Sequence, residues 1–360
     1  MTIRSLGEDA YFAASNSEDG FCSYYKECFD SARVGHVYAV KGGPGTGKSR
    51  FLRDVAVCAE GNGWKSEYIY CSSDPDSLDG VILSRGERCM ALIDATAPHV
   101  YEPMHPGVRE EIVNLGVFWD AKKLTLHTDA INALNAQKSE AYRRAYRYLC
   151  GMGKMIENRD ALVMPFVRHG AIRAFAEKMM QGVASEKAYE VRHALMRSVG
   201  MHGEVGFDTY FANAEKLYLV QDCRGSAQYL MQELGRIAME KHLKIRLSHD
   251  PVCPDQIDAI QLCSARITVA VCKEEMSEYD FKPIHMRRFV EIARMKAVRG
   301  EINFAERMSR AMLDGAVEAL AAVREAHFRL EALYMQAMDF EAKENFTKSF
   351  CDSLFGLQNR

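Results

Sequence analysis

The sequence predicts an α/β protein made of two similar halves, and three features of the chain lead to this fold class. A glycine-rich loop at 42–49 stands between a strand-like run at 37–40 and a helix-like run at 51–56. The second half repeats the pattern of the first, and each half ends in a long segment with helical periodicity. We therefore expect two tandem domains, each with a parallel sheet in three layers and a helical arm.

The glycine-rich loop matches the pattern G-x-x-x-x-G-K-[ST] of a phosphate-binding loop, or P-loop. Its glycines allow backbone N–H groups to point inward and bind an anion at a helix N-terminus. Lys48 is expected to reach the β- and γ-phosphates of a nucleotide, and Ser49 to complete the ligand shell of Mg²⁺. The motif thus predicts a P-loop NTPase-like domain. The expected nucleotide-binding residues are Gly42, Gly43, Pro44, Gly45, Thr46, Gly47, Lys48, Ser49 and Arg50.

Further candidates follow the next two predicted strands. The run 88–94 is apolar and ends on Asp94, where P-loop proteins carry the carboxylate that holds Mg²⁺. Asp74 precedes Pro75, a pair that predicts a helix N-cap, and it follows the strand expected at 66–71. With Lys48, the candidate catalytic residues are Asp94, Asp74 and His99; Thr96 and Glu102 lie on the same predicted side of the sheet.

An internal repeat is the most informative feature after the loop. Shifted by 179 positions, 47–94 lies over 226–273 without a gap. The nucleotide residues are not repeated, since Ser226-Ala227-Gln228 replaces Gly47-Lys48-Ser49 and Lys273 replaces Asp94. The second loop begins with Asp222, whose charge would repel phosphate. We expect a degenerate second domain and one nucleotide per chain.

The repeat and the helical periodicity give the expected domain boundaries. The first domain is expected at 1–188 with its arm at about 121–185, where one helix runs to about Asp160 and another covers 171–181. The second domain is expected at 189–360 with its arm at about 284–355.

The composition of the chain limits the kinds of binding partner and the compartment that we expect. The formal net charge is −3, which gives no general attraction to nucleic acid or to an anionic membrane. The eleven cysteines show no C-x-x-C spacing and are typical of reduced thiols in a cytoplasmic protein. No apolar run approaches the ~20 residues of a membrane span, so we expect a soluble chain. ATP is favoured over GTP because no guanine-reading N/T-K-x-D motif is present. The sequence does not identify a protein or small-molecule partner.

Three segments together resemble a little-characterised bacterial family of tandem P-loop, ATPase-like proteins: 41–49, 71–81 and 94–99. The resemblance implies two P-loop domains and ATP as the ligand, over nearly the whole chain. Both halves commonly carry a Gly-Thr-Gly-Lys-Ser/Thr loop in that family, and this chain departs from that pattern in its second half. The family implies no particular reaction.

Three functions are compatible with the sequence. The first is a Mg²⁺-dependent ATPase or ATP-driven switch, in which Arg224 or Arg266 of the second half could contribute charge at the γ-phosphate. The second is a small-molecule kinase that uses Asp74 as the base beside the acceptor hydroxyl. The third is a non-catalytic module in which bound nucleotide stabilises an interaction surface.

Overall fold

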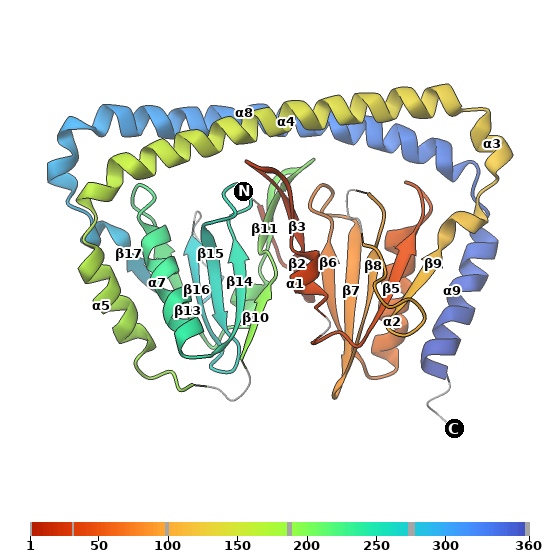
Figure 1. Cartoon of the computed structure of the whole chain (residues 1–360), viewed down its shortest axis with the longest axis horizontal. Coiled ribbons are helices and arrows are strands. Elements are labelled where there is room, and N and C mark those ends of the chain that lie inside the picture. The colour runs from red at the N-terminus through yellow and green to blue at the C-terminus, as the bar shows by residue number, and fades with distance from the viewer. Residues whose placement is uncertain (1, 31, 98–100, 186–188, 273–277, 357–360) are drawn as a thin grey trace.

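The computed structural model describes residues 2–30, 32–97, 101–185, 189–272 and 278–356. Two six-stranded sheets stand beside each other, and two long helices run across the same end of both (Figure 1). The predicted α/β class is confirmed at this level, because strands and helices are mixed and both sheets contain parallel pairs.

The first sheet has the strand order β2-β6-β7-β8-β5-β9. Its strands are β2 (Asp9–Phe12), β5 (His36–Lys41), β6 (Lys65–Tyr70), β7 (Leu78–Arg85), β8 (Arg88–Asp94) and β9 (Glu110–Asn114). Strand β7 runs antiparallel to both β6 and β8, whereas the other neighbours are parallel. The prediction of a wholly parallel sheet is therefore wrong, and so is the helix expected after Asp74.

A tight turn explains this difference. The backbone N–H of Ser77 donates to the Asp74 carbonyl, and that of Cys71 donates to the Ser77 carbonyl. The chain thus reverses at once into β7, without the long crossover that a parallel neighbour requires. Asp74 and Pro75 begin a turn here, which is the other position that these residue types favour.

The second sheet repeats this arrangement with the order β10-β14-β15-β16-β13-β17. Its strands are β10 (Glu190–His193), β13 (Lys216–Gln221), β14 (Lys244–His249), β15 (Ile257–Leu262), β16 (Ile267–Cys272) and β17 (Lys282–His285). The middle strand β15 is again antiparallel to both neighbours. The two halves of the chain therefore share one topology, as the sequence repeat predicts.

Helices cover the outer face of each sheet, and each sheet receives one helix from the opposite half. These helices are α2 (Lys48–Gly61), α5 (His169–Met180), α7 (Ala227–Glu240) and α9 (Phe340–Phe355). Helix α9 packs on α2 of the first half, and α5 packs on α7 of the second. The arms α4 (Thr128–Val163) and α8 (Arg299–Met335) make this exchange possible, because they run antiparallel along each other above both sheets (Figure 1).

Smaller elements complete the chain. They are β1 (Thr2–Arg4), β3 (Ala14–Ser17), β4 (Gly20–Ser23), β11 (Arg197–Gly200), β12 (Gly203–Phe207), α1 (Tyr25–Cys28), α3 (Ala121–Thr125), α6 (Thr209–Ala212) and the 3₁₀ turns Leu115–Phe118, Met164–Phe166, Met286–Phe289 and Ile292–Ala297. Strand β1 pairs with β12 of the second half, so the first residues cross the expected domain boundary.

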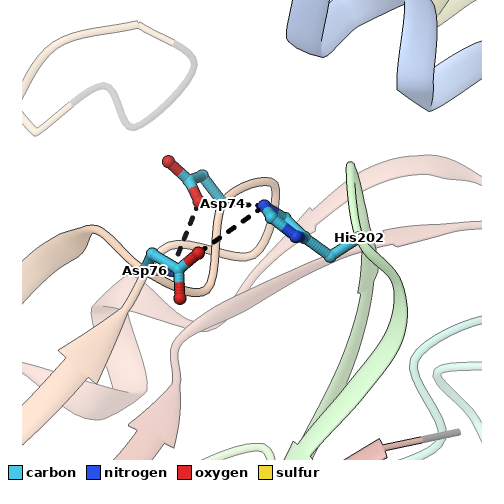
Figure 2. A group of neighbouring side chains, drawn as sticks. All are labelled: Asp74, Asp76 and His202. Carbon is cyan, nitrogen blue, oxygen red and sulfur yellow. Dashed lines mark hydrogen bonds and ion pairs between the residues drawn. The ribbon is translucent and has the colours of Figure 1, made fainter.

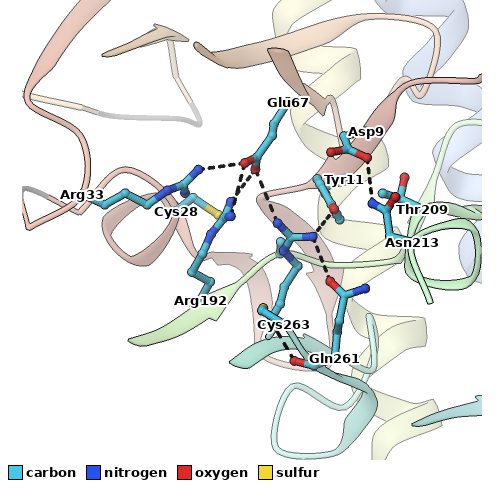
Figure 3. Close-up of polar contacts among 12 residues, drawn as sticks. Asp9, Tyr11, Cys28, Arg33, Glu67, Arg192, Thr209, Asn213, Gln261 and Cys263 are labelled. Atoms are coloured by element: carbon cyan, nitrogen blue, oxygen red, sulfur yellow. Dashed lines mark hydrogen bonds and ion pairs between the residues drawn. The ribbon is translucent and has the colours of Figure 1, made fainter. Parts of the chain in front are cut away.

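The two halves share an apolar core and a buried network of charges. One apolar cluster contains Tyr11 and Ile69 from the first half together with Tyr210 and Leu219 from the second. Beside it, Glu67 accepts hydrogen bonds from Arg33 and Arg192 (Figure 3). Glu67 Oε2 also lies 3.8 Å from Arg246 Nη2. Burial opposes ionisation of Glu67, but Arg192, Arg246 and Arg33 outweigh it and lower the pKa of this carboxyl. These contacts join the two halves, because Glu67 and Arg33 belong to the first half and Arg192 and Arg246 to the second.

Candidate functional site

The first loop, Gly42–Ser49, connects β5 to the N-terminus of α2. Gly45 and Gly47 have φ angles of 71° and 76°, in the left-handed region that side chains disfavour. The Thr46 hydroxyl donates to the Gly43 carbonyl, and the Thr96 hydroxyl donates to the Gly42 carbonyl. The glycines therefore allow this loop shape, and the two threonines hold it.

Lys48 and Asp94 meet under this loop. The Lys48 ammonium donates to the carbonyl oxygens of Gly42 and Gly43 at 3.0 and 2.9 Å, and its Nζ lies 3.6 Å from Asp94 Oδ2. Burial raises the pKa of Asp94, and the nearby Lys48 charge partly opposes this shift. The Ser49 hydroxyl oxygen lies at the same place and accepts from the Leu78 N–H at 2.9 Å. The structure thus brings together the lysine, the hydroxyl and the carboxylate that the sequence singled out.

A cavity of about 350 Å³ opens beside these groups. The first half contributes the loop, the turn after β6 and the end of β8, and both arms contribute further walls. The main lining residues are Gly45, Thr46, Lys48, Ser49, Asp74, Asp79, Asp94, Thr96, Lys138, Tyr142, Val323, His327, Glu331 and Met335. Burial, and then the nearby Lys48 charge, lowers the pKa of Lys138. The site is therefore composite, because α8 belongs to the second half of the sequence.

Helix α8 lies directly against the first loop. A Cβ atom on Gly45 would come within 2.7 Å of the Glu331 carbonyl oxygen, and one on Gly43 within 2.8 Å of the Tyr334 ring. The hydrogen bond from His327 lowers the pKa of Glu331, and the Gly45 N–H and the Lys48 charge act in the same direction. The Glu331 carboxylate is thus held as an anion at the loop.

Asp74 lines the same cavity and belongs to a small group with Asp76 and His202 (Figure 2). His202 Nε2 is 3.5 Å from Asp74 Oδ1 and 3.7 Å from Asp76 Oδ2. Asp76 also pairs with Arg4. These oxygen and nitrogen atoms could hold a cation, although Arg4 already pairs with Asp76.

Other predicted residues lie elsewhere. Arg50 points away from the cavity and pairs with Asp54 at 2.8 Å, because it lies on the exposed face of α2. Glu102 pairs with Lys41. His99 and Lys273 lie outside the described residues.

The two arginines expected to reach the γ-phosphate do not line the described part of this cavity. Arg224 pairs with Glu306 at the second loop, and Arg266 pairs with Glu215 at the other end of β16. The second half reaches the first loop through α8 instead.

The second loop, Asp222–Ser226, is filled by the chain's own side chains. Asp222 accepts hydrogen bonds from the N–H groups of Gly225 and Ala227, where a phosphate would have to bind. Asp160 of α4 lies against the same loop and accepts from Gln228 and Gln256. These contacts explain physically how a loop without the lysine and serine of the first loop stays folded.

Comparison of the chain with protein-family models, curated proteins and solved structures gave no match. Within the described part of the chain, every helix is too short or too polar to cross a bilayer. The chemistry of the site must therefore be inferred from its own residues.

Sequence reasoning missed the residues that the arms contribute. Lys138 and Tyr142 lie four positions apart on α4, as do His327 and Glu331 on α8. Polar residues at this spacing share a helix face. That signal is common on exposed helices, and nothing in it indicates contact with a loop far away in the sequence.

Proposed function

We propose that the chain binds one Mg²⁺-ATP at the first loop and acts as an ATPase or an ATP-driven switch. The observation that carries this proposal is the convergence of Lys48, Ser49 and Asp94 at one cavity beside the N-terminus of α2. The resemblance to tandem P-loop proteins supports the same ligand. The second loop is proposed to be empty of nucleotide because its anion-binding groups are already used.

The residues at the cavity fit the proposed ligand. A cavity of about 350 Å³ falls within the usual range of small-molecule sites. The loop leads directly into the N-terminus of α2, where backbone N–H groups favour binding of an anion. Ser49 and Asp94 offer the hard oxygen ligands that Mg²⁺ prefers. The metal would neutralise phosphate charge, while Lys48 would exchange its loop carbonyls for phosphate oxygens.

A specific observation favours a second candidate function. Asp74 lines the same cavity and is buried enough to orient an acceptor hydroxyl. A small-molecule kinase would place its acceptor between Asp74 and the nucleotide, with Asp74 as the base. We rank this function below ATP hydrolysis because Asp74 already interacts with His202.

Binding of a non-hydrolysable ATP analogue by Lys48→Ala tests the proposal. The variant should lose most of its affinity while its circular dichroism and urea unfolding stay like those of the unsubstituted protein. Arg50→Ala, on the exposed face of the same helix turn, is the matched control and should bind normally. Normal binding by Lys48→Ala would contradict the proposed site.

Phosphate release separates the possible functions. Release from ATP with no added acceptor favours an ATPase. Release that requires an added acceptor, and that is lost in Asp74→Asn, favours a kinase. Tight binding with no turnover in either assay favours the non-catalytic module.

A further inference from the structure

We propose that Glu331 is an internal substitute for nucleotide phosphate, which ATP must displace from the first loop. This inference rests on the function proposed above, since it assigns a regulatory contact to the same site. The carboxylate belongs to α8, so its displacement would connect nucleotide binding to the position of an arm that spans both halves.

The first line of evidence is the contact between Glu331 and the groups that would bind phosphate. The backbone carbonyl of Glu331 lies against Gly45, its carboxylate lies 3.5 Å from His327 Nε2, and the residue lines the cavity beside the loop. Lys48 and Gly45 line the same cavity. Phosphate oxygens and the Glu331 carboxylate would therefore compete for the same cavity, and two anions at one loop would repel each other.

The second line of evidence comes from the internal repeat. Asp160 precedes the first residue of α5, His169, by nine positions, and Glu331 precedes the first residue of α9, Phe340, by nine positions. A Cβ atom on Gly225 would come within 2.3 Å of Asp160 Oδ1, and one on Gly45 would come within 2.7 Å of the Glu331 backbone carbonyl oxygen. Each arm thus places an acidic residue on the loop of the opposite half.

The two contacts differ in how firmly they are held. Asp160 forms an ion pair with Arg159 and accepts from Gln228 and Gln256, so three side chains hold it at the second loop. Within the described part of the chain, Glu331 pairs with the His327 side chain alone, and it lines the cavity that ATP would occupy. The repeat has therefore left one arm contact fixed and the other exchangeable.

Nucleotide affinity measures this competition directly. Glu331→Gln keeps the shape of the side chain and removes its charge, and Glu331→Ala removes the contact altogether. Both variants should bind Mg²⁺ with a non-hydrolysable ATP analogue about tenfold more tightly, as expected when one charge-assisted hydrogen bond no longer has to be broken. Glu325→Gln makes the same charge change on an exposed part of α8 and should leave affinity unchanged.

Each outcome has a distinct meaning. Tighter binding by both Glu331 variants, with Glu325→Gln unchanged, supports the inference. Equal or weaker binding by both overturns it and leaves the proposed function intact. An unchanged affinity with loss of phosphate release in Glu331→Gln also overturns it, because Glu331 would then act in hydrolysis. Absence of binding in the unsubstituted protein and in every variant overturns the proposed function as well.

The fluorescence of Trp119 provides an independent test of whether α8 moves when nucleotide binds. Its ring lies 5.8 Å from that of Tyr334 on α8 and close to Gly43 of the loop, and the only other tryptophan of the chain is Trp64. Saturation with the ATP analogue should change the emission of the unsubstituted protein, and Trp119→Phe should abolish the change. An emission that stays constant at saturation would overturn displacement of the arm.

Discussion

Lys48 lies between the carbonyl oxygens of its own loop and the carboxylate of Asp94. Asp94 is buried, and burial raises its pKa, so the lysine is the main group that favours its ionised form. A divalent ion would take over this role when it enters with the nucleotide. The Asp94 carboxylate would therefore favour binding of the metal ion and oppose binding of the phosphates.

Asp94→Asn should weaken nucleotide binding in the presence of Mg²⁺ and leave binding in EDTA equal or stronger. The neutral amide is a poorer magnesium ligand, but it no longer repels phosphate. Titrations with and without Mg²⁺ check this, and Asp314→Asn, which makes the same change at an exposed position of α8, serves as control. Equal losses under both conditions would show that Asp94 does not act beside the metal.

At the scale of single residues, the sequence predicted the half of the site that lies within one motif. Lys48, Ser49 and Asp94 come from a local pattern, because the strand, loop and helix that position them are neighbours in sequence. His327 and Glu331 reach the loop only through the packing of α8, which no local pattern records. Arg50 shows the opposite error, since its place beside the motif does not turn it toward the cavity.

At the scale of helices and strands, the exchange of α5 and α9 between the two halves matters most for the core and for the site. Helix α9 covers α2 through a cluster of aromatic rings, in which Phe350 lies 5.3 Å from Phe51 and 5.2 Å from Tyr38. Residues at the end of the chain thus complete the core of its first half. The α2 helix carries Lys48 and Ser49 at its N-terminus, so this packing also supports the site.

Phe350→Ala should lower the free energy of unfolding by about 2 kcal/mol, below the cost at a fully buried phenylalanine, because the ring is only partly buried. Hydrogen exchange should quicken in α2 more than in α7. Phe304→Ala removes an exposed ring of α8 and should change neither quantity. Faster exchange in α7 than in α2 would contradict the exchanged packing.

The periodicity of the sequence predicted the arms well but could not predict their exchange. Apolar residues at spacings of three and four define which face of a helix is buried, and they do not identify the partner. The direction of β7 was missed for a related reason. The residue pattern of a buried strand is the same whether the strand is parallel or antiparallel to its neighbour. The direction of β7 is set by the tight turn at Asp74–Ser77.

At the scale of the whole molecule, the two halves meet through buried polar groups as well as apolar ones. His193 and His249 lie on adjacent strands of the second sheet, and their ring nitrogens are 2.9 Å apart. Both rings stack beside Tyr24 of the first half. Burial lowers the pKa of His193, and burial together with the His193 charge lowers the pKa of His249.

This histidine pair predicts a loss of stability in mild acid. Since the folded pKa values lie below the ordinary value of 6.5, the unfolded chain binds more protons in this range. The stability is thus complete above that value and is lost as pH falls toward the folded pKa values. Urea unfolding at about pH 7.5 and about pH 5.5 should show the decrease, and His193→Asn with His249→Asn should flatten it. An unchanged slope in the double variant would place the pH dependence elsewhere.

The number of nucleotides bound per chain tests the central claim most directly. Isothermal titration with Mg²⁺ and a non-hydrolysable ATP analogue, corrected for active fraction, should give a stoichiometry of one, and Lys48→Ala should abolish the heat of binding. The reason is that Lys48 serves the first loop, whereas Asp222 and Asp160 already occupy the second. A stoichiometry of two, or one site that survives Lys48→Ala, would contradict this account.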